Sequence, residues 1–318
     1  MKNLIYYILP MLLLIFSCSK MKNENNNTSK TKTYNQQVDS LLNKMTLEEK
    51  VGQMVQYSGG WDLTGPAKNE NNKLKKEQIS KGLVGSMLNV TSVEQVREAQ
   101  QLAIENSRLK IPMLFGFDVI HGYQTMFPIP LAEAASWDLD LMKQTAETAA
   151  KEATAAGINW TFAPMVDISQ DARWGRIMES AGEDPYLNTQ VALAKMQGYQ
   201  GDDLSKPETM AATAKHFAGY GFVIGGREYN SVNIGEFEFH NTVLPPFKAL
   251  AENGVATFMN SFSDRDGIPA TANQNLQTDI LKNEWGFNGF IVSDWDSIGE
   301  LEEHGVAEDL SDAAKIAV

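Results

Sequence analysis

The chain has 318 residues, of which 43% are hydrophobic, and a single α/β barrel typically needs about 250 residues. Its net charge of −13 argues against a nucleic-acid partner and against electrostatic binding to an anionic membrane, because both attract clustered Lys and Arg. A single cysteine excludes an intramolecular disulfide and a cysteine metal cluster. A neutral, polar substrate is compatible with these properties, although charge alone does not select one.

The N-terminal segment predicts export. Lys2 precedes an apolar run over residues 4–16, which is too short for a standard membrane-spanning helix and has the pattern of a signal peptide. The run ends in Ile-Phe-Ser-Cys, so residues 1–18 resemble a bacterial lipoprotein signal, with Cys18 as the lipidated first residue of the mature protein. The alternative is a plain signal peptide with an incidental cysteine. We expect an exported protein, periplasmic or held at the outer membrane by a lipid anchor, with residues 19–34 as a disordered tether.

The folded part, expected over residues 35–318, alternates between helical and strand patterns. Apolar residues recur at helical spacing over residues 38–54, which predicts an opening helix. Short apolar runs then predict strands at 83–88, 111–117, 159–166, 210–215, 255–260 and 290–293, with a shorter one near 269–271. Amphipathic segments between these runs predict helical crossovers and a parallel sheet. No Gly-x-Gly-x-x-Gly follows a strand, which argues against a dinucleotide-binding fold.

Capping residues mark several of the predicted helices. Residues 91–94 have the spacing of a capping box, and Asp138 can cap a helix over residues 139–156 that Gly157 would end. The last stretch, residues 309–318, is amphipathic and has no C-terminal cap. Seven strand signals alternating with helices predict an α/β fold, a (β/α)8 TIM-like barrel that is incomplete at the C-terminus of this chain.

Polar residues stand where the predicted strands end. In α/β barrels the carboxyl ends of the strands form one rim, on which active sites are built. The residues expected on that rim are Asp118, Asp167, Asp171, Arg173, Lys215, His216, Ser261, Phe262, Asp294 and Trp295. Carboxylates and cations can bind sugar hydroxyls, and an aromatic ring can pack on the C–H face of a pyranose. Each residue alone could merely satisfy a loop, so the prediction of a sugar site depends on their common placement.

Five motifs then occur in order along the chain. They are GFDVIHG at residues 116–122, ARWGR at 172–176, GEDP at 182–185, AKHFA at 214–218 and VSDW at 292–295. Together they resemble glycoside hydrolase family 3, in particular its β-glucosidase branch, and the resemblance runs from about residue 34 to the end. Five motifs in register are far more specific than one.

The resemblance implies a retaining, exo-acting β-glucosidase that removes terminal β-D-glucosyl residues from β-linked oligosaccharides or β-glucans. Asp294 matches the nucleophile that forms a covalent glycosyl-enzyme, and Trp295 matches the aromatic residue on which the leaving sugar stacks. The residues that match the family's other sugar-binding positions are Asp118, Arg173, Lys215, His216 and Met259. Arg176 and Glu179 are expected to buttress the loop of Arg173 rather than to contact sugar. No metal and no cofactor is implied.

In the β-glucosidase branch the acid/base Glu comes from a second α/β domain, which would follow this chain and is therefore expected to be absent from it. One departure from the family is Phe262, because many relatives carry there a Tyr whose hydroxyl meets the nucleophile. The chain also lacks the second His and the Asp-Ser-His loop of the β-N-acetylhexosaminidases, which argues against that activity. A β-xylosidase on the same site, or a carbohydrate-binding fragment without catalysis, remain as alternatives.

Overall fold

The computed structural model describes residues 36–59 and 72–318. The expected lipoprotein signal with Cys18 and the expected tether therefore lie outside the described residues. Within residues 36–59 and 72–318, every helix is too short or too polar to cross a bilayer.

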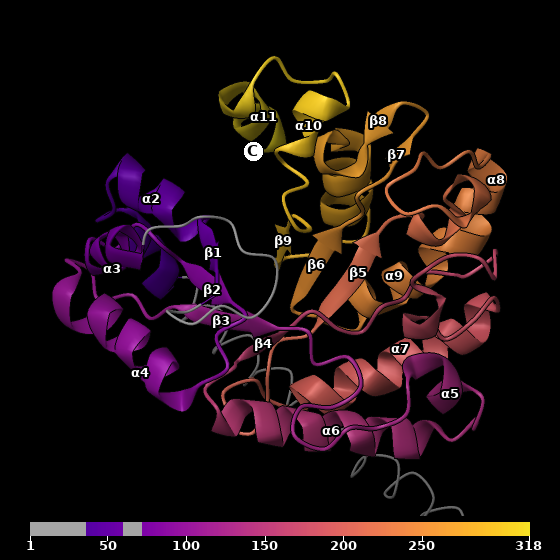
Figure 1. Ribbon diagram of the computed structural model, residues 1–318, viewed down its shortest axis with the longest axis horizontal. Helices are drawn as coiled ribbons and strands as arrows, with labels where there is room; N and C mark the ends of the chain where they lie inside the picture. The colour runs from indigo at the N-terminus through magenta and orange to yellow at the C-terminus, as the bar shows by residue number, and fades with distance from the viewer. Residues whose placement is uncertain (1–35, 60–71) are drawn as a thin grey trace, which may run out of the picture.

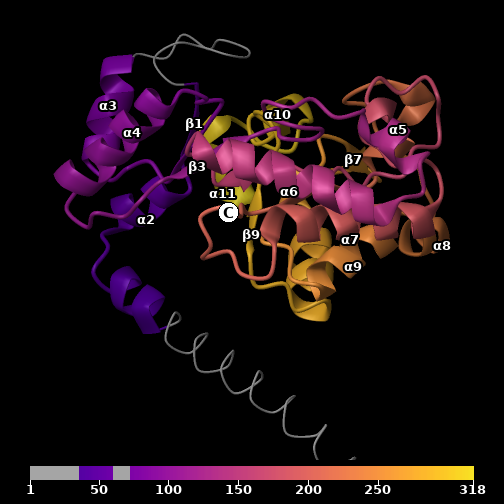
Figure 2. The ribbon, with the colours of Figure 1, turned by 90° about the horizontal axis from the view of Figure 1, so that it is seen from below.

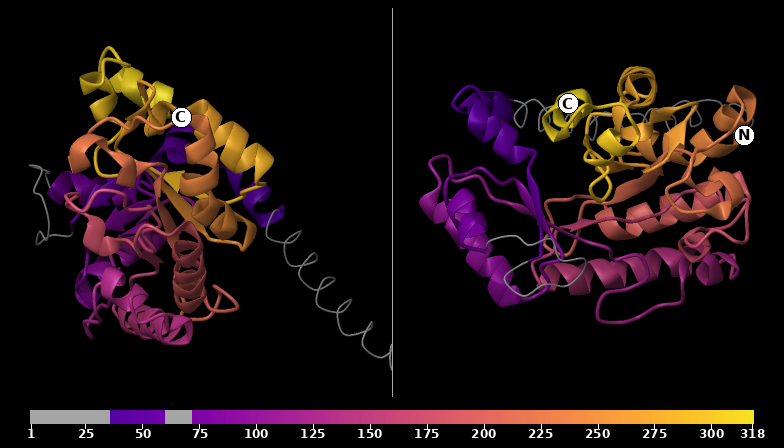
Figure 3. Two further views of the ribbon diagram at one scale, coloured as in Figure 1. Left: turned by 90° about the vertical axis from the view of Figure 1, so that its right-hand side faces the viewer. Right: turned by 45° about the horizontal axis from the view of Figure 1, so that its top comes forward.

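Parallel strands follow one another in chain order around a barrel wall. The first sheet consists of β1 (Gln56–Ser58), β2 (Ser86–Leu88), β3 (Leu114–Phe117) and β4 (Trp160–Thr161). The second consists of β5 (Thr213–Phe217), β6 (Thr257–Asn260) and β9 (Phe290–Val292). Parallel bridges from Trp160 to Ala211 and from Met165 to Lys215 join the two sheets. The predicted α/β barrel is confirmed, and Figures 1 and 3 show its earlier and later strands as two arcs that face each other.

Helices connect the strands and cover the outside of the barrel. The longer ones are α2 (Leu47–Gln53), α3 (Asn72–Ser80), α4 (Val93–Gln101), α6 (Leu139–Ala155), α7 (Pro185–Gln200), α9 (Leu244–Glu252), η7 (Asn275–Glu284) and α11 (Leu310–Ala317). Shorter ones are η1 (Leu102–Asn106), α5 (Pro130–Ala134), η2 (Ile177–Glu179), η3 (Tyr220–Phe222), η4 (Ile224–Gly226), α8 (Glu236–Glu238), η5 (Phe239–Val243), η6 (Ala270–Ala272) and α10 (Glu300–Glu303).

Side-chain caps explain where several helices begin. The carboxylates of Asp138, Asp184 and Asp309 each accept a hydrogen bond from a backbone N–H in the first turn of α6, α7 and α11. The predicted capping box at 91–94 is displaced by one residue, because Ser92 is the N-cap of α4. The predicted opening helix is interrupted, since Thr46 and Glu49 form a capping box that starts α2 afresh.

The main core lies between the barrel wall and the helices α6, α7 and α9, which run side by side in Figure 2. The buried face of α6 is built from alanines, so α7 approaches it closely. At Gly198 in α7 an added Cβ would lie 2.6 Å from the Ala146 Cβ and 2.4 Å from the Lys143 carbonyl oxygen. A glycine is therefore required at this crossing.

The barrel interior is filled by large side chains below the rim. Trp160 is 1% exposed, and its indole N–H donates to the hydroxyls of Thr213 in β5 at 2.9 Å and Thr257 in β6 at 3.0 Å. Phe162 and Met259 pack beside it. This layer forms the floor beneath the polar rim and ties β4 to β5 and β6.

Two strand predictions need correction. The segment near 269–271 does not join the barrel, because β8 (Ile268–Pro269) pairs antiparallel with β7 (Asp264–Arg265) in a hairpin after β6. The seventh barrel strand is instead β1, which was not predicted. It has three residues, two of them polar, and follows α2 after only two residues, so it lacks the apolar run that marks the other strands.

Candidate active site

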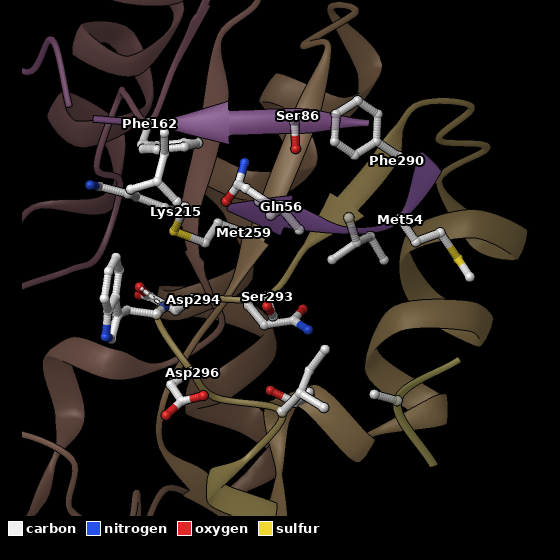
Figure 4. Close-up of a pocket in the computed structure, with 18 of the residues that line it drawn as sticks. Met54, Gln56, Ser86, Phe162, Lys215, Met259, Phe290, Ser293, Asp294 and Asp296 are labelled. Atoms are coloured by element: carbon white, nitrogen blue, oxygen red, sulfur yellow. Dashed lines mark hydrogen bonds between the residues drawn. The ribbon is translucent and has the colours of Figure 1, made fainter. Parts of the chain in front are cut away.

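A cavity of about 1370 Å3 opens at the carboxyl ends of the strands and continues down between β1 and β9. Toward the carboxyl ends of the strands it is lined by Asp118, Arg176, Lys215, Tyr229, Met259, Phe262, Asp294 and Trp295. Toward their amino ends the lining includes Gln56, Ser86 and Phe290. Figure 4 shows Lys215, Met259 and Asp294, which come from β5, β6 and the segment after β9, around the same space. The cavity thus joins residues that are far apart in the sequence.

Asp294 is the second residue after β9, and its side chain is 12% exposed. One carboxylate oxygen, Oδ1, accepts a hydrogen bond of 2.6 Å from the backbone N–H of Trp295. The other, Oδ2, is buried and accepts no hydrogen bond from the described residues. Burial raises the pKa of this carboxyl to about 6, against the opposing effects of Lys215, the Trp295 N–H and Arg176. At neutral pH the group is therefore a carboxylate with a free, desolvated oxygen, which suits a nucleophile.

Lys215 and Asp118 form an ion pair across the rim. The Lys215 ammonium donates to Asp118 Oδ1 at 2.7 Å; Lys215 is the central residue of β5, and Asp118 directly follows β3. The Lys215 side chain is 3% exposed, whereas that of Asp118 is 51% exposed. The pair therefore presents a carboxylate to the cavity with a buried cation behind it, an arrangement that can bind neighbouring sugar hydroxyls.

His216 does not line the cavity but lies behind Asp294. Its Nδ1 is 2.8 Å from Asp167 Oδ2, and its Nε2 is 3.4 Å from Asp294 Oδ2. Burial, together with the charges of Arg176 and Lys215, holds the pKa of the imidazole well below its usual value. The Lys215–His216 and Phe217–Ala218 peptide bonds around it are cis.

The structure differs from the sequence prediction for the arginine. The Arg173 side chain is 74% exposed, pairs with Asp171 at 2.6 Å and is not among the residues that line the cavity. Arg176, three residues later, lines the cavity and is held by Glu179 through two hydrogen bonds of 2.7 and 2.9 Å. Burial disfavours the charged Arg176 guanidinium, but Glu179 more than offsets this effect and raises its pKa. Arg176 therefore replaces Arg173 as the candidate sugar-binding arginine.

Aromatic side chains form the remaining wall. Phe262 is 6% exposed, and the ring of Tyr229 packs edge-to-face on it with centroids 4.7 Å apart. Tyr229 lines the cavity together with Trp295. Sequence reasoning missed Tyr229 because it stands in an irregular loop, residues 227–230, rather than at a strand end.

Among residues 36–59 and 72–318, no group of three or more His, Cys, Asp or Glu side chains is arranged to hold a metal ion. The described rim offers carboxylates, an ammonium, a guanidinium and aromatic rings, with the His216 imidazole behind it. An α/β barrel with such a rim around a buried carboxylate defines the class of barrel glycoside hydrolases.

The comparisons with known proteins agree with this class. The family model described as "Glycosyl hydrolase family 3 N terminal domain" matches residues 46–318, so the chain belongs to glycosyl hydrolase family 3. The membership predicted from the five motifs is therefore confirmed.

Individual relatives add two substrate classes. A periplasmic β-glucosidase of Salmonella typhimurium is 40% identical over 281 residues, which cover 88% of this chain and 36% of that protein. A putative β-xylosidase of Formosa agariphila is 33% identical over 337 residues, which cover 100% of this chain and 44% of that protein. A β-glucosidase from Listeria innocua in complex with isofagomine aligns with a TM-score of 0.81 at 40% identity, covering 89% of this chain and 39% of that one. A further structure of the Listeria protein contains glucose. The chain spans less than half the length of each of these relatives.

Proposed function

We propose that this chain is the barrel part of a retaining, exo-acting β-glucosidase that hydrolyses terminal β-D-glucosyl residues of oligosaccharides or β-glucans. The observation that carries the proposal is the position of Asp294, buried at the cavity wall with a free Oδ2 and with the Lys215–Asp118 pair on the same rim. The β-glucosidases of Salmonella typhimurium and Listeria innocua support the choice of glucosides.

The proposed mechanism is a double displacement. Asp294 Oδ2 attacks the anomeric carbon and forms a covalent glycosyl-enzyme, while a general acid protonates the leaving oxygen. Water, activated by the same group as a base, then releases the sugar with retained β configuration. Asp118, Lys215 and Arg176 bind hydroxyls of the sugar whose bond is cleaved, and Met259 lines its subsite. Trp295 stacks on the leaving sugar.

The acid/base is proposed to be a Glu in a second domain that follows residue 318. Two considerations support this proposal. The described carboxylates that line the cavity are Asp118, Asp294 and Asp296, and the first two already have other roles. The relatives are also more than twice as long as this chain.

A second candidate activity is that of a β-xylosidase on the same site. It is favoured by the Formosa agariphila relative, which is a putative β-xylosidase and aligns with the whole chain. A glucoside and a xyloside differ by one hydroxymethyl group, so the two candidate activities require different shapes only in the part of the pocket that meets this group.

For location we propose an exported lipoprotein in which Cys18 carries the lipid and residues 19–34 tether the barrel. The periplasmic β-glucosidase of Salmonella typhimurium supports export. Replacing Cys18 by Ala and finding the protein still in the membrane fraction would count against the anchor.

The test of function uses the full-length protein. Hydrolysis of aryl β-glucoside, β-xyloside and N-acetyl-β-glucosaminide is measured in parallel, with Asp294→Ala as the nucleophile variant. A fluorinated glucoside that slows deglycosylation is then used to label the nucleophile, and the labelled peptide is identified by mass spectrometry.

The proposal expects a preference for the glucoside, loss of activity in Asp294→Ala and a label on Asp294. A preference for the xyloside would favour the second candidate. Undiminished activity in Asp294→Ala would move the nucleophile elsewhere. A folded protein that binds glucose but hydrolyses none of the substrates would favour a carbohydrate-binding role.

A further inference from the structure

Three buried side chains form a row of polar contacts behind the cavity. Asp167 Oδ2 lies 2.8 Å from His216 Nδ1, and His216 Nε2 lies 3.4 Å from Asp294 Oδ2. The side chains of Asp167 and His216 are each 1% exposed, and that of Asp294 is 12% exposed. His216 Nε2 and Asp294 Oδ2 are both buried without a hydrogen-bond partner among the described residues, although they face each other.

Asp167 is fixed from several directions. Its Oδ2 also accepts the backbone N–H of His216 at 2.9 Å. Its backbone carbonyl accepts hydrogen bonds from Ser180 Oγ at 2.7 Å and Asn188 Nδ2 at 3.3 Å. The bonds from Ser180 and Asn188 hold the backbone of Asp167, and the His216 N–H keeps Oδ2 beside the imidazole, where the carboxylate favours the tautomer in which Nδ1 carries the hydrogen.

The row has two contacts that each need a hydrogen, one on either side of the imidazole, but a neutral imidazole supplies only one. A neutral imidazole carries one N–H, whereas the ring has an acidic side chain on each side. If Nδ1 donates to Asp167, then Nε2 presents a lone pair to the lone pairs of an ionised Asp294. A buried acceptor without a donor is costly, so an added proton between His216 Nε2 and Asp294 Oδ2 is favoured.

Charged groups around the row act in both directions. Lys215 of β5 and Arg176 of the segment after β4 disfavour an added proton, whereas the carboxylates of Asp118 and Glu179 favour it. The other titratable groups that face Asp294 or pack on His216 are Glu300 of α10, Tyr229 and Tyr220. The cations are each paired with one of these carboxylates, Lys215 with Asp118 and Arg176 with Glu179, so their effect on the row is reduced.

We propose that Asp167 is a positioning residue that turns His216 Nε2 and Asp294 Oδ2 into a two-acceptor clamp for a single hydrogen. In the free protein at about pH 6 and below the clamp holds a proton, and in the sugar complex a hydroxyl that reaches Asp294 from the cavity donates to its carboxylate in place of that proton. Sugar binding therefore expels one proton to solvent and leaves Asp294 as a carboxylate. The inference rests on the proposed function in one respect, that sugar binds against Asp294.

The free protein with one added proton takes up a neutral sugar and releases one proton to the buffer, and no bond other than the N–H or O–H of the clamp is broken. The energetic consequence is that the nucleophile becomes ionised when the substrate binds. Burial raises the pKa of Asp294 to about 6 and that of Asp167 to about 7, which places the exchange near neutral pH.

The first measurement needs no variant. Glucose binding to the full-length wild-type protein is measured by titration calorimetry at pH 6 in two buffers with different enthalpies of ionisation. A clamp that is half protonated in the free protein releases about half a proton per site at pH 6, and the release falls toward zero at pH 8. Equal binding enthalpies in both buffers across pH 5.5–7, which means no proton release, would overturn the proposal.

The second measurement uses Asp167→Asn, which keeps the shape of the side chain and removes its charge. Without that negative charge the clamp binds its proton less tightly, so the proton release and the acid limb of kcat/KM both move to lower pH by about one unit. A purely structural role for Asp167 would lower kcat/KM by one factor at every pH and leave the limb in place, which would contradict the proposal.

The matched control is Asp138→Asn, the same chemical change at the N-cap of α6, where Asn caps as well as Asp. It is expected to change neither the proton release nor the acid limb. Failure of the inference is distinguishable from failure of the proposed function. A protein that hydrolyses no glycoside but releases a proton on binding glucose would contradict only the function, whereas an active glucosidase without proton release would contradict only the clamp.

Discussion

Lys215 Nζ lies 2.7 Å from Asp118 Oδ1, although the two residues are 97 positions apart in the chain. Lys215 lies within β5 and Asp118 directly follows β3, and these two strands are not neighbours in the barrel wall. The ammonium is buried and the carboxylate is half exposed, so the ion pair links the two halves of the rim and faces the cavity with its acidic partner. The proposed sugar site therefore depends on the closure of the barrel and not on any one loop.

Replacing Asp118 by Asn tests this pair. The substitution removes a charge-assisted acceptor for sugar hydroxyls and leaves the Lys215 ammonium without its ionic partner. A hydrogen bond to a charged group contributes about 1.5–3 kcal/mol, so kcat/KM for an aryl β-glucoside should fall about 10- to 150-fold. The exposed Asp140→Asn in α6 serves as the control and should stay within about twofold of wild type. Wild-type kcat/KM in Asp118→Asn would remove this residue from the site.

The ionisation of Asp294 predicts a pH profile. Burial raises the pKa of this carboxyl to about 6, and only the ionised form can attack the sugar. The active form is therefore lost as the pH falls through about 6, and kcat/KM should drop roughly tenfold for each further pH unit. The profile is measured with the full-length protein on an aryl β-glucoside. An acid limb near pH 4, the ordinary range of an exposed Asp, would mean that the group which must be ionised is not buried as Asp294 is.

The two arginines of the ARWGR motif make a matched pair. Arg176 lines the cavity and is held by Glu179, whereas Arg173 is exposed and pairs with Asp171. Arg176→Ala should lower kcat/KM about 10- to 150-fold, because it removes a charged donor from the site. Arg173→Ala should change kcat/KM by about threefold or less, since an exposed ion pair contributes little. The reverse order of the two effects would restore Arg173 as the sugar-binding residue.

Strand-end reasoning predicted the parts of the site that barrel topology alone determines. Asp118, Lys215 and Asp294 each lie within two residues of the carboxyl end of a strand, and the barrel brings them to one cavity. Apolar runs located six of the seven barrel strands, since each of the six contains a short apolar run between polar loops. Membership of family 3 was predictable from five short motifs, which do not depend on loop geometry.

Loop residues were harder to place because neighbouring side chains compete for each position. Arg173 and Arg176 are three residues apart in one irregular segment, and the sequence does not show that Asp171 binds the first while Glu179 orients the second. Tyr229 has a positive φ of 61° in its loop, a conformation that no periodic pattern reveals. The role of Asp167 likewise depends on the geometry of its contact with His216.

A buried ion pair away from the site predicts a large effect on stability. Lys195 of α7 pairs with Glu133 of α5, both side chains are 5% exposed, and Thr145 of α6 donates to Glu133 at 2.8 Å. Burial lowers the pKa of Lys195 while Glu133 opposes that shift. The pair thus holds together three helices, including the one that follows the Asp118 segment.

Lys195→Met leaves the Glu133 carboxylate buried and unpaired, so it should lower the free energy of unfolding by about 3–5 kcal/mol. Adding Glu133→Leu removes the orphaned charge and should restore most of that loss, because a buried pair is often replaceable by apolar residues. The control is Lys143→Met in α6, whose ion pair with Glu147 is about 40% exposed on both sides and should contribute less than about 1 kcal/mol. Urea denaturation of the full-length proteins gives the three values. If the single and double variants at the buried pair were equally destabilised, the loss would come from packing around the lysine side chain and not from an uncompensated charge.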